Sequence, residues 1–277
     1  MIGMDRWTDD ERLGALTAAR RRRGSVRPVS MGDTTIGGDA PVSIQSMTNT
    51  PTEDWKATLD QIYQLAEAGC QIVRVAVPTL QAARVLHRMT DLSPIPVVAD
   101  IHFNHRLALE SIDGGVAGIR LNPGNIGSEK KVAEVTRAAS AAAIPIRIGV
   151  NGGSLEKDIE EAHGGVTAAA LVDSALRHVT MLEKLSFHDI IISLKSSSVP
   201  MTIEANRLMA ERRSYPLHIG ITEAGSGDEG RVKSLLGVGL LLLEGIGETI
   251  RISLTGPPVH EIVAARNLVR AIGRFGW

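Results

Sequence analysis

The sequence predicts an α/β protein that folds as a (β/α)8 TIM barrel, with a short N-terminal helix and a hairpin before it. Strand-like apolar segments alternate eight times with segments of helical periodicity, a succession typical of parallel barrels. The 277 residues suit one such barrel, and no linker rich in Pro, Gly or Ser divides them. An open, doubly wound sheet is the structural alternative.

The first part of the chain, residues 1–40, is interpreted as an extension that precedes the barrel. Residues 1–24 have helical character, and the arginine run at residues 20–23 is interpreted as a solvated helix end. Two short runs around residues 32–33, within residues 29–36, predict a small hairpin. We expect this hairpin to close the bottom of the barrel.

The barrel itself is assigned to residues 41–277. Its expected strands are residues 42–48, 72–77, 96–101, 118–122, 144–151, 190–195, 217–222 and 250–254. Helical periodicity follows each strand, for example at residues 54–68, 80–90, 128–143, 199–213 and 258–272.

Five of these strands contain a basic residue, which is unusual in the strands of a barrel. Barrel strands are covered by helices outside and by packed side chains inside, so they are typically continuous aliphatic runs. The exceptions contain Arg74, Arg120, Arg147, Lys195 and Arg251. Side chains alternate along a strand, and the face opposite each cation is mostly Ile, Leu or Val. That aliphatic face must meet the helices, so the cations are predicted to point into the lumen.

Polar residues share the face of four of these cations. They are Asn122 beside Arg120, Gly149 and Asn151 beside Arg147, Ser193 and Ser197 beside Lys195, and Ser253 and Thr255 beside Arg251. The lumen is therefore predicted to be polar at the carboxyl ends of these strands.

Five cations in one lumen require compensation, because burying an unpaired charge costs several kcal/mol. Internal ion pairs are one explanation, but the strand ends supply only two visible carboxylates, Asp100 and Glu223. Two acids against five bases leave an excess of positive charge. A phosphate- or diphosphate-bearing ligand would balance it, since arginine binds phosphate through paired hydrogen bonds. Glycine-containing loops at residues 122–128, 151–154 and 223–230 support this prediction, because amides at helix N-termini favour anions.

Histidines provide weaker candidates. Asp100 and His102 share a face at the end of the third strand, where a hydrogen-bonding role is favoured over a metal site because the ligand set is incomplete. His218, in the seventh strand, is interpreted either as a lumen group or as a core histidine with satisfied hydrogen bonds. The histidines on predicted helices or loops are expected at the surface, and they are His87, His163, His178, His188 and His260.

Composition excludes several classes of protein. With 30 basic and 31 acidic side chains the net charge is −1, which argues against a general nucleic-acid binder. The longest apolar stretch, residues 235–243, is too short for a membrane span of about 20 residues. The charged residues 1–23 do not resemble a signal peptide, so we expect a cytoplasmic protein with no nucleic-acid or membrane partner. The single cysteine, Cys70, cannot form a cysteine-ligated cluster and is expected to be a buried, inert thiol.

Motifs at the strand ends resemble those of the 4-hydroxy-3-methylbut-2-enyl-diphosphate synthase family, which acts in the non-mevalonate isoprenoid pathway. The motifs are QSMTNT (45–50), IVRVAVP (72–78), VADIHF (98–103), RLNPGNIG (120–127), IPIRIGVNGGSLEKD (144–158), HIGITEAG (218–225), LLLEGIG (241–247) and RISL (251–254). The resemblance runs from about residue 20 to the end of the chain, and it covers the N-terminal barrel domain of the family.

This resemblance implies a barrel that binds 2-C-methyl-D-erythritol 2,4-cyclodiphosphate for its reductive ring opening, an oxidoreductase reaction. The implied phosphate-binding residues are Arg74, Arg120, Arg147, Lys195 and Arg251, joined by Asn151 and Ser253. Glu223 corresponds to the barrel carboxylate that assists protonation or departure of a substrate oxygen, so it is the implied catalytic residue. Asp100, His102 and His218 are secondary candidates, and no metal ligand is assigned in this chain.

The family also has a C-terminal domain with a 4Fe–4S cluster, held by three cysteines and a glutamate. This sequence has no such cysteines, so we expect the chain to bind no cluster and to be inactive alone. A fragment of a longer enzyme, a barrel that works with a separate cluster subunit, and a paralogue that binds without catalysing all stay open. The implied partners are an electron donor such as flavodoxin or ferredoxin and, in a possible homodimer, a second copy.

Two other functions fit part of the pattern. A diphosphate transferase resembling dihydropteroate synthase would also have a cationic barrel mouth. Its pterin site would favour aromatic or apolar walls, however, and only 3% of the residues are aromatic. The other alternative is a non-catalytic barrel that binds a phosphorylated ligand.

Overall fold

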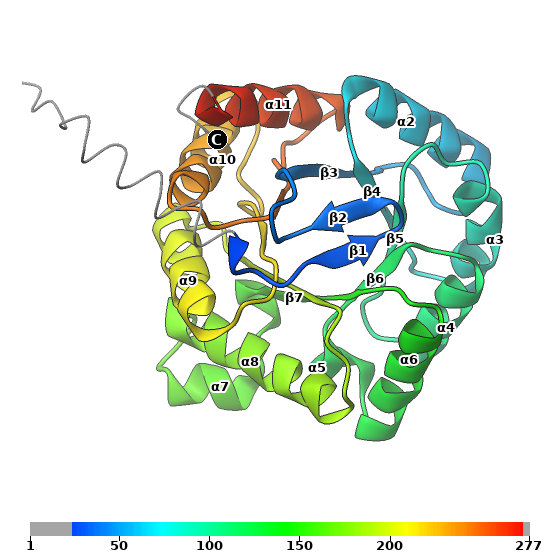
Figure 1. Ribbon diagram of the computed structural model, residues 1–277, viewed down its shortest axis with the longest axis horizontal. Coiled ribbons are helices and arrows are strands. Elements are labelled where there is room, and N and C mark those ends of the chain that lie inside the picture. The colour runs from blue at the N-terminus through cyan, green and yellow to red at the C-terminus, as the bar shows by residue number, and fades with distance from the viewer. Residues whose placement is uncertain (1–23, 274–277) are drawn as a thin grey trace, which may run out of the picture.

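The computed structural model describes residues 24–273, in which parallel strands form a nearly closed ring (Figure 1). The ring contains β3 (Ser43–Met47), β4 (Ile72–Ala76), β5 (Val97–Asp100), β6 (Gly118–Leu121), β7 (Ile146–Asn151), β8 (Ile190–Lys195), β9 (His218–Ile219) and β10 (Thr249–Ile250). They pair in the order β8-β7-β6-β5-β4-β3-β10-β9. A parallel bridge between Ile192 and Leu217 joins the two ends of the sheet. The predicted (β/α)8 barrel is therefore confirmed, whereas the helix expected at residues 1–24 lies almost entirely outside the described residues.

Helices surround the ring on its outer side (Figure 1). They are α2 (Trp55–Ala68), α3 (Leu80–Thr90), α4 (His105–Asp113), α6 (Glu129–Ala141), α8 (Ala168–Lys184), α9 (Val199–Arg212), α10 (Gly227–Leu243) and α11 (Val259–Gly273). The side chains of Asp54, Thr79 and Thr167 begin three of them by accepting a backbone N–H of the first turn. Across residues 24–273, no helix has the length and apolar character needed to cross a membrane.

Three short elements interrupt the simple alternation of strands and helices. The loop after β6 contains α5 (Pro123–Ile126), and the loop after β7 contains the 3₁₀ turn η1 (Gly152–Ser154) and α7 (Lys157–Ala162). These elements lie at the carboxyl ends of two strands that carry predicted site residues, where barrels hold their functional loops.

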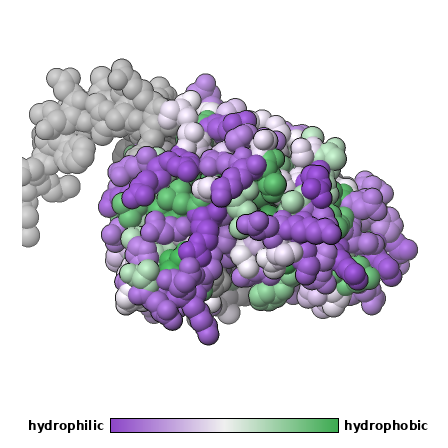
Figure 2. Space-filling model, turned by 90° about the horizontal axis from the view of Figure 1, so that it is seen from below, coloured by the Kyte–Doolittle hydropathy of each residue, from purple (hydrophilic) through white to green (hydrophobic). Residues whose placement is uncertain are grey.

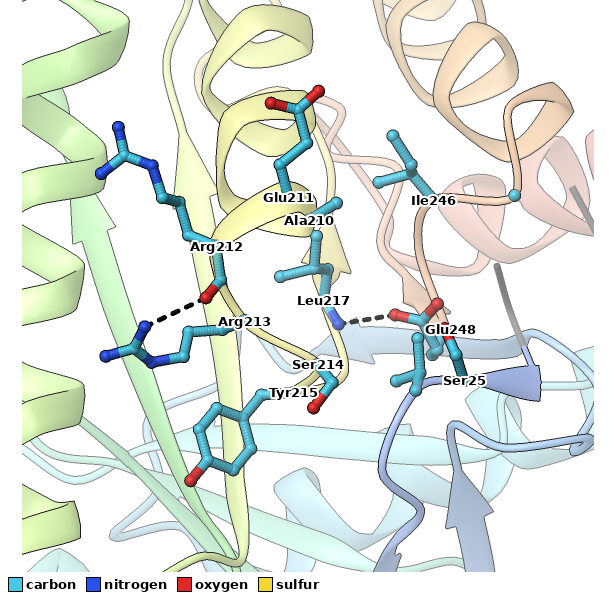
Figure 3. A pocket seen from close by; sticks show the side chains of 12 residues that line it. Ser25, Ala210, Glu211, Arg212, Arg213, Ser214, Tyr215, Leu217, Ile246 and Glu248 are labelled. Carbon is cyan, nitrogen blue, oxygen red and sulfur yellow. Dashed lines mark hydrogen bonds between the residues drawn. The ribbon is translucent and has the colours of Figure 1, made fainter. Parts of the chain in front are cut away.

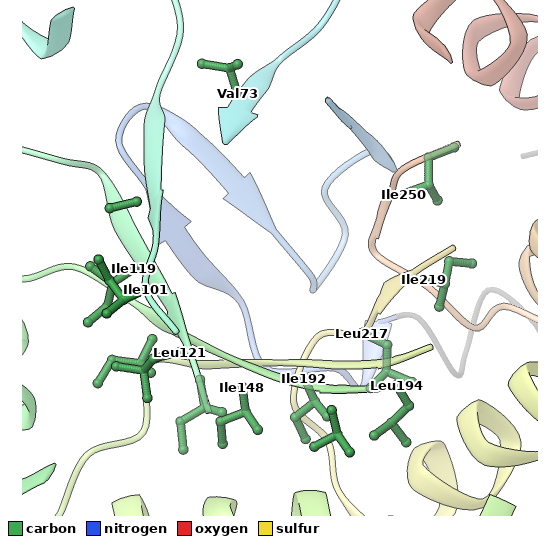
Figure 4. Close-up of a cluster of buried hydrophobic side chains, with 14 of the residues drawn as sticks. Val73, Ile101, Ile119, Leu121, Ile148, Ile192, Leu194, Leu217, Ile219 and Ile250 are labelled. Atoms are coloured by element: carbon green, nitrogen blue, oxygen red, sulfur yellow. The ribbon is translucent and has the colours of Figure 1, made fainter. Parts of the chain in front are cut away.

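The main core lies between the strands and the helices. Aliphatic side chains such as Ile119, Ile148 and Ile192 are fully buried there. Figure 4 shows these side chains on the side of the strands that faces away from the hairpin and the lumen. The alternation read from the sequence therefore places the aliphatic face outward, as predicted, and leaves the other face for the lumen.

The hairpin closes the bottom of the lumen, as its position in the sequence predicts. Strands β1 (Val29–Met31) and β2 (Thr34–Ile36) pair antiparallel and lie across the ring in Figure 1. Gly32 forms the turn with φ +58° and approaches Pro96 so closely that a Cβ would lie 2.9 Å from the proline ring. A separate apolar cluster joins hairpin and strands, made of Val29, Met31, Ile36, Ile72, Val98 and Ile191.

Two strands are much shorter than predicted, whereas the others differ from the prediction by at most two residues. The expected strand at residues 217–222 is reduced to β9, and that at residues 250–254 is reduced to β10. Beyond β10 the backbone leaves the sheet, because the N–H of Leu254 donates to the Glu261 carboxylate at 3.1 Å instead of a neighbouring strand. Arg251 follows β10 directly, with its N–H still donating to the Ile219 carbonyl at 3.1 Å, and Ser253 lies in the loop at the mouth of the barrel.

Candidate functional site

A polar cavity of about 140 Å³ lies at the carboxyl ends of the strands. Its walls include the five cations predicted to face the lumen, namely Arg74, Arg120, Arg147, Lys195 and Arg251. The remaining lining residues are Asp100, His102, Gly149, Asn151, Ser193, Ile221, Thr222 and Ser253. Side chains from strands far apart in the sequence thus converge on one pocket.

Two glycines make room for the cations inside the ring. A Cβ at Gly149 would lie 2.5 Å from Nε of Arg120, whose Nη2 donates to the Gly149 carbonyl at 3.2 Å. A Cβ at Gly220 would lie 2.9 Å from Nζ of Lys195. A glycine within a strand often marks such a close approach, so these positions carried a signal for the site.

Asp100 is the acid at one side of the cavity. Its carboxylate lies 3.2 Å from Nη1 of Arg120 and 3.4 Å from Nε of Arg74. Burial alone would raise the pKa of Asp100, but the charges of Arg74 and Arg120 outweigh it and hold the pKa below its ordinary value. Asp100 is therefore ionised, and it neutralises part of the positive charge.

The second acid is Glu261, which the sequence analysis missed. Its carboxylate receives Nε and Nη2 of Arg251, each at 3.1 Å, and Oγ of Ser46 at 2.9 Å. Glu261 lies in the first turn of α11 and is only 2% exposed, on the same buried face as Ala264 and Ala265. An acid on the apolar face of an amphipathic helix was the available signal.

Arg147 and Lys195 have no acid partner within residues 24–273. Arg147 is 2% exposed, and its Nη1 contacts Nδ1 of His218 and, at 3.5 Å, Oε1 of Gln45. Its Nε and Nη2 are buried without a hydrogen-bond partner in the described part of the chain. Burial and the neighbouring charge of Arg74 lower the pKa of Arg147. Buried donors of this kind are costly unless something supplies acceptors.

His218 forms the floor beneath the cavity and resolves the choice left open by the sequence. It is 1% exposed, and its Nε2 lies 3.4 Å from Nζ of Lys195. Burial, then the charges of Lys195 and Arg147, lower the pKa of His218 well below its ordinary value, so the ring is neutral. Burial and the nearby charge of Arg147 also lower the pKa of Lys195. His218 is thus a buried lumen group between two cations.

Glu223 is placed differently from the other predicted site residues. It follows Thr222, which lines the cavity, but Glu223 itself is exposed and does not line it. Its φ of +49° is a left-handed conformation that is uncommon and strained for a residue other than glycine. Glu223 was expected to be one of the two acids among the lumen cations, but it is exposed and does not line the cavity. Glu261 takes that place.

Other candidate ligands are distributed between the cavity and the loops. His102 lines the cavity, with Nε2 3.8 Å from the Asp100 carboxylate. Asn122 instead accepts the N–H of Gly124 at 3.1 Å and so begins α5. Within the described part of the chain, no group of three or more His, Cys, Asp or Glu side chains could hold a metal ion.

The expectation that His178 lies at the surface is wrong. His178 is 1% exposed, because α5 and α7 in the loops after β6 and β7 cover this face of α8. Its Nε2 lies 2.8 Å from Oε1 of Glu156. The extra short helices were not predicted, so the sequence offered no reason to bury this histidine.

A second cavity, of about 220 Å³, lies at the opposite end of the barrel (Figure 3). It is bounded by the end of α9 and by the segments that lead into β9 and β10. Its polar groups have partners, since Glu248 accepts the N–H of Leu217 at 2.7 Å and Nη1 of Arg213 donates to the Arg212 carbonyl at 3.0 Å. No lining side chain in this cavity carries a buried polar atom without a hydrogen-bond partner in the described residues. Residues at the bottom face of a barrel usually stabilise the fold. The cavity at the carboxyl ends of the strands, called the upper cavity below, is therefore favoured as the functional site.

Comparison with known proteins finds one family over most of the chain. Residues 26–266 match the family described as the GcpE TIM-barrel domain. The chain is 54% identical over 250 residues to 4-hydroxy-3-methylbut-2-en-1-yl diphosphate synthase (flavodoxin) of Geobacter sulfurreducens, covering 90% of this chain and 71% of the relative. The protein of the same name from Thermodesulfovibrio yellowstonii is 55% identical over 252 residues, covering 91% and 72%.

Solved structures show likeness in fold alone. Dihydropteroate synthase from Xanthomonas albilineans aligns with a TM-score of 0.61 at 12% identity, over 89% of this chain and 97% of that one. The 3-dehydroquinate dehydratase of Geobacillus kaustophilus aligns with a TM-score of 0.66 at 12% identity, over 92% and 100%. At such identities a shared TIM barrel says nothing of a shared substrate.

Proposed function

Since the chain belongs to the GcpE family of 4-hydroxy-3-methylbut-2-en-1-yl diphosphate synthases, we propose that its upper cavity binds 2-C-methyl-D-erythritol 2,4-cyclodiphosphate. The observation that carries the proposal is the excess of positive charge, because five cations converge on a pocket where, among residues 24–273, Asp100 and Glu261 are the acids paired with them. A cyclic diphosphate supplies the missing negative charge and the acceptors that Arg147 lacks.

The cations have separate tasks in this proposal. Arg147 and Lys195, which lack acid partners in the described residues, bind the diphosphate most directly from the floor of the cavity. Arg74, Arg120 and Arg251 are held in place by Asp100 or Glu261 and approach the ligand from the walls. Asn151 and Ser253 add polar contacts at the mouth. Positioning by prior ion pairs lowers the entropy lost when the ligand binds.

Glu223 is proposed as the catalytic carboxylate. It lies one residue beyond the cavity lining, at the rim, where its exposed side chain can exchange protons with solvent. Its neighbour Thr222 lines the cavity, which puts Glu223 within one residue of the proposed ligand. In this role Glu223 would donate a proton to the oxygen that leaves the opened ring.

The family's 4Fe–4S cluster does not fit the residues of this chain. The only cysteine is Cys70, which lies beneath β3 and β4 with Sγ 3.1 Å from the Ile72 carbonyl. Burial raises the pKa of this thiol to about 12, so it is a poor ligand, as expected of an inert thiol. We therefore propose that the chain binds substrate but does not turn it over alone. The cluster and an electron donor, flavodoxin in the names of the relatives or else ferredoxin, would act from outside these residues. The cytoplasm is the proposed compartment.

A homodimer is the proposed assembly, and the outer face of α10 supports it. The apolar side chains Val232, Leu236, Leu240 and Leu243 are 61, 54, 39 and 44% exposed. A stripe of this kind is unusual at the surface and often marks an interface. The face viewed in Figure 2, on the side of α7 and α8, is instead mainly hydrophilic with small separate apolar groups.

The spacing of the α10 stripe suits a second copy of the chain. Its members are arranged nearly symmetrically about residues 237–238, so two antiparallel copies of α10 would bring Leu236 close to Leu240 and Val232 close to Leu243. The same arrangement brings Lys233 of one copy near Glu244 of the other. Sedimentation should show a dimer that the double variant Leu236→Lys/Leu240→Lys converts to a monomer. Leu92→Lys, at a 52% exposed site on another face, is the control and should stay dimeric.

Isothermal titration with the cyclic diphosphate tests the substrate assignment. Arg120→Ala and Arg147→Ala should each weaken binding at least about tenfold, as expected when a buried partner of an anion is removed. Arg207→Ala, at an exposed ion pair with Glu244 far from the cavity, is the control. Unchanged affinity in both cavity variants would refute the site. A pterin diphosphate that bound more tightly than the cyclic diphosphate would favour the dihydropteroate-synthase-like alternative.

A further inference from the structure

We infer that His178 and Glu156 are positioning residues. Their contact fixes the positions of the loops after β6 and β7 relative to α8 and to the cavity. The inference deepens the proposed function, since both loops continue from strands that carry phosphate-binding candidates. It rests on a buried polar contact that the anion site itself does not use.

The pair joins one loop to a barrel helix. His178 lies on α8, and its Nε2 is 2.8 Å from Oε1 of Glu156. The other oxygen of Glu156 accepts Oγ of Ser174 at 2.7 Å, one turn earlier on α8. Glu156 immediately precedes α7 and follows Asn151, which lines the cavity, by five residues. The loop after β7 is therefore held against α8 by one carboxylate, through a hydrogen bond from Ser174 and a close contact with the His178 ring.

The second loop rests on the same pair. A Cβ at Gly124 would lie 2.8 Å from Cε1 of His178 and 3.3 Å from Oε1 of Glu156. The backbone of α5 therefore packs directly on the histidine–glutamate contact. Gly124 is also bound to Asn122, whose side chain accepts its N–H, and this segment continues from Arg120. Movement of the pair would shift both cavity walls together.

Burial makes this contact more demanding than a surface ion pair. His178 is 1% exposed. The neighbouring pair of Arg177, next to His178, and Asp158, two residues after Glu156, also connects α8 to α7, but it is exposed. Exposed pairs contribute little because water screens them. A buried polar contact loses much of its energy when its geometry changes. The buried pair can therefore set the spacing of the loops, whereas its exposed neighbour cannot.

Hydrogen exchange of the ligand-free protein tests the inference directly. His178→Leu should speed exchange of the amides in residues 122–128 and 151–157 by about tenfold or more, through local opening. Glu156→Gln should speed exchange in the same segments by a smaller factor, because Ser174 and His178 meet different oxygens of Glu156 and an amide keeps only one of them. Arg177→Gln is the matched control and should leave both segments unchanged. Equal protection in the wild-type chain and His178→Leu would overturn the inference.

A double-mutant cycle on ligand affinity provides a second test that tolerates some loss of stability. Gly124→Ala should weaken binding of the cyclic diphosphate about tenfold, because its methyl group meets the His178 ring. In the His178→Ala background the ring is absent, and the same substitution should cost little. Additive effects would mean that Gly124 and His178 are not coupled, and the inference would fall.

Different results would contradict the proposed substrate site and the positioning role of His178 and Glu156. If the wild-type chain does not bind the cyclic diphosphate, the proposed function is wrong, and hydrogen exchange still decides the role of the pair. If Arg120→Ala and Arg147→Ala weaken binding but His178→Leu changes neither affinity nor exchange, the substrate site stands and the positioning role is wrong.

Discussion

The lower and upper layers of the lumen are built from the same strands but have opposite chemistry. In the lower layer Ile72, Val98 and Ile191 meet the hairpin in a dry apolar cluster. Two residues further along the same strands, on the same face, stand Arg74, Asp100 and Ser193 of the cavity. A barrel therefore offers equivalent positions, and the side chains alone decide whether a layer stabilises the fold or binds a ligand.

The two layers contribute with opposite sign to the stability of the folded chain. Burial of the hairpin side chains contributes favourably, at about 25 cal/mol per Å² of apolar surface. The upper layer concentrates cations that repel each other, and burial lowers the pKa of Arg74 to about 10. The lower layer of the lumen therefore stabilises the fold, whereas the repelling cations of the upper layer destabilise the ligand-free protein.

Removing an acid from the upper layer should have the largest effect. Glu261→Ala leaves Arg251 buried without its partner and should cost about 3–5 kcal/mol of the free energy of unfolding. Urea denaturation should show this loss, and inorganic diphosphate should restore part of it. Asp158→Ala, at an exposed pair with Arg177, should cost less than about 1 kcal/mol. Similar losses in both variants would remove the distinction between buried and exposed acids.

A truncation in the lower layer should separate stability from binding. Met31 is 1% exposed and packs in the hairpin cluster, so Met31→Ala should cost about 2–5 kcal/mol of unfolding free energy. Anion affinity should stay within twofold of the wild-type value, because the cavity is not touched. A large loss of affinity, measured by titration well below the melting temperature, would show that the layers are coupled.

Replacing the unpaired cation should stabilise the ligand-free protein. Arg147→Met removes a buried charge with unpartnered donors and should raise the free energy of unfolding by about 1–4 kcal/mol. The same variant should bind the cyclic diphosphate about a hundredfold more weakly. Thermal melting and titration on one sample check both effects. A destabilised variant would indicate that Arg147 supports the fold and not the ligand.

The pH dependence of stability should give the smallest effect. Lys195 has a pKa well below 10.5 in the folded chain, so the unfolded state binds more protons between these two values. Stability should therefore rise with pH across this interval, by at most about 1.4 kcal/mol per pH unit from this group. Comparing wild type with Lys195→Met isolates the contribution, because Cys70 and His218 titrate in both. Parallel pH curves for the two proteins would contradict the lowered pKa.

Part of the site could be read before the fold was known. Period-two alternation placed Arg74, Arg120 and Arg147 on the lumen face, because each stands opposite aliphatic neighbours. The hairpin was equally local, since its turn residues lie between two short apolar runs. Such features depend on a few consecutive residues and on rules that hold for any strand or turn.

Other features depended on distant packing. His178 is buried by short helices in two loops, and the periodicity of the sequence does not predict where these loops run. The sequence by itself determined that four strands and the segment after a fifth would each bring a cation to one lumen, in excess of the acids near them. Only the tertiary structure decided that Glu261, and not Glu223, neutralises Arg251, because the choice depends on how α11 approaches the ring and how the chain turns after β9.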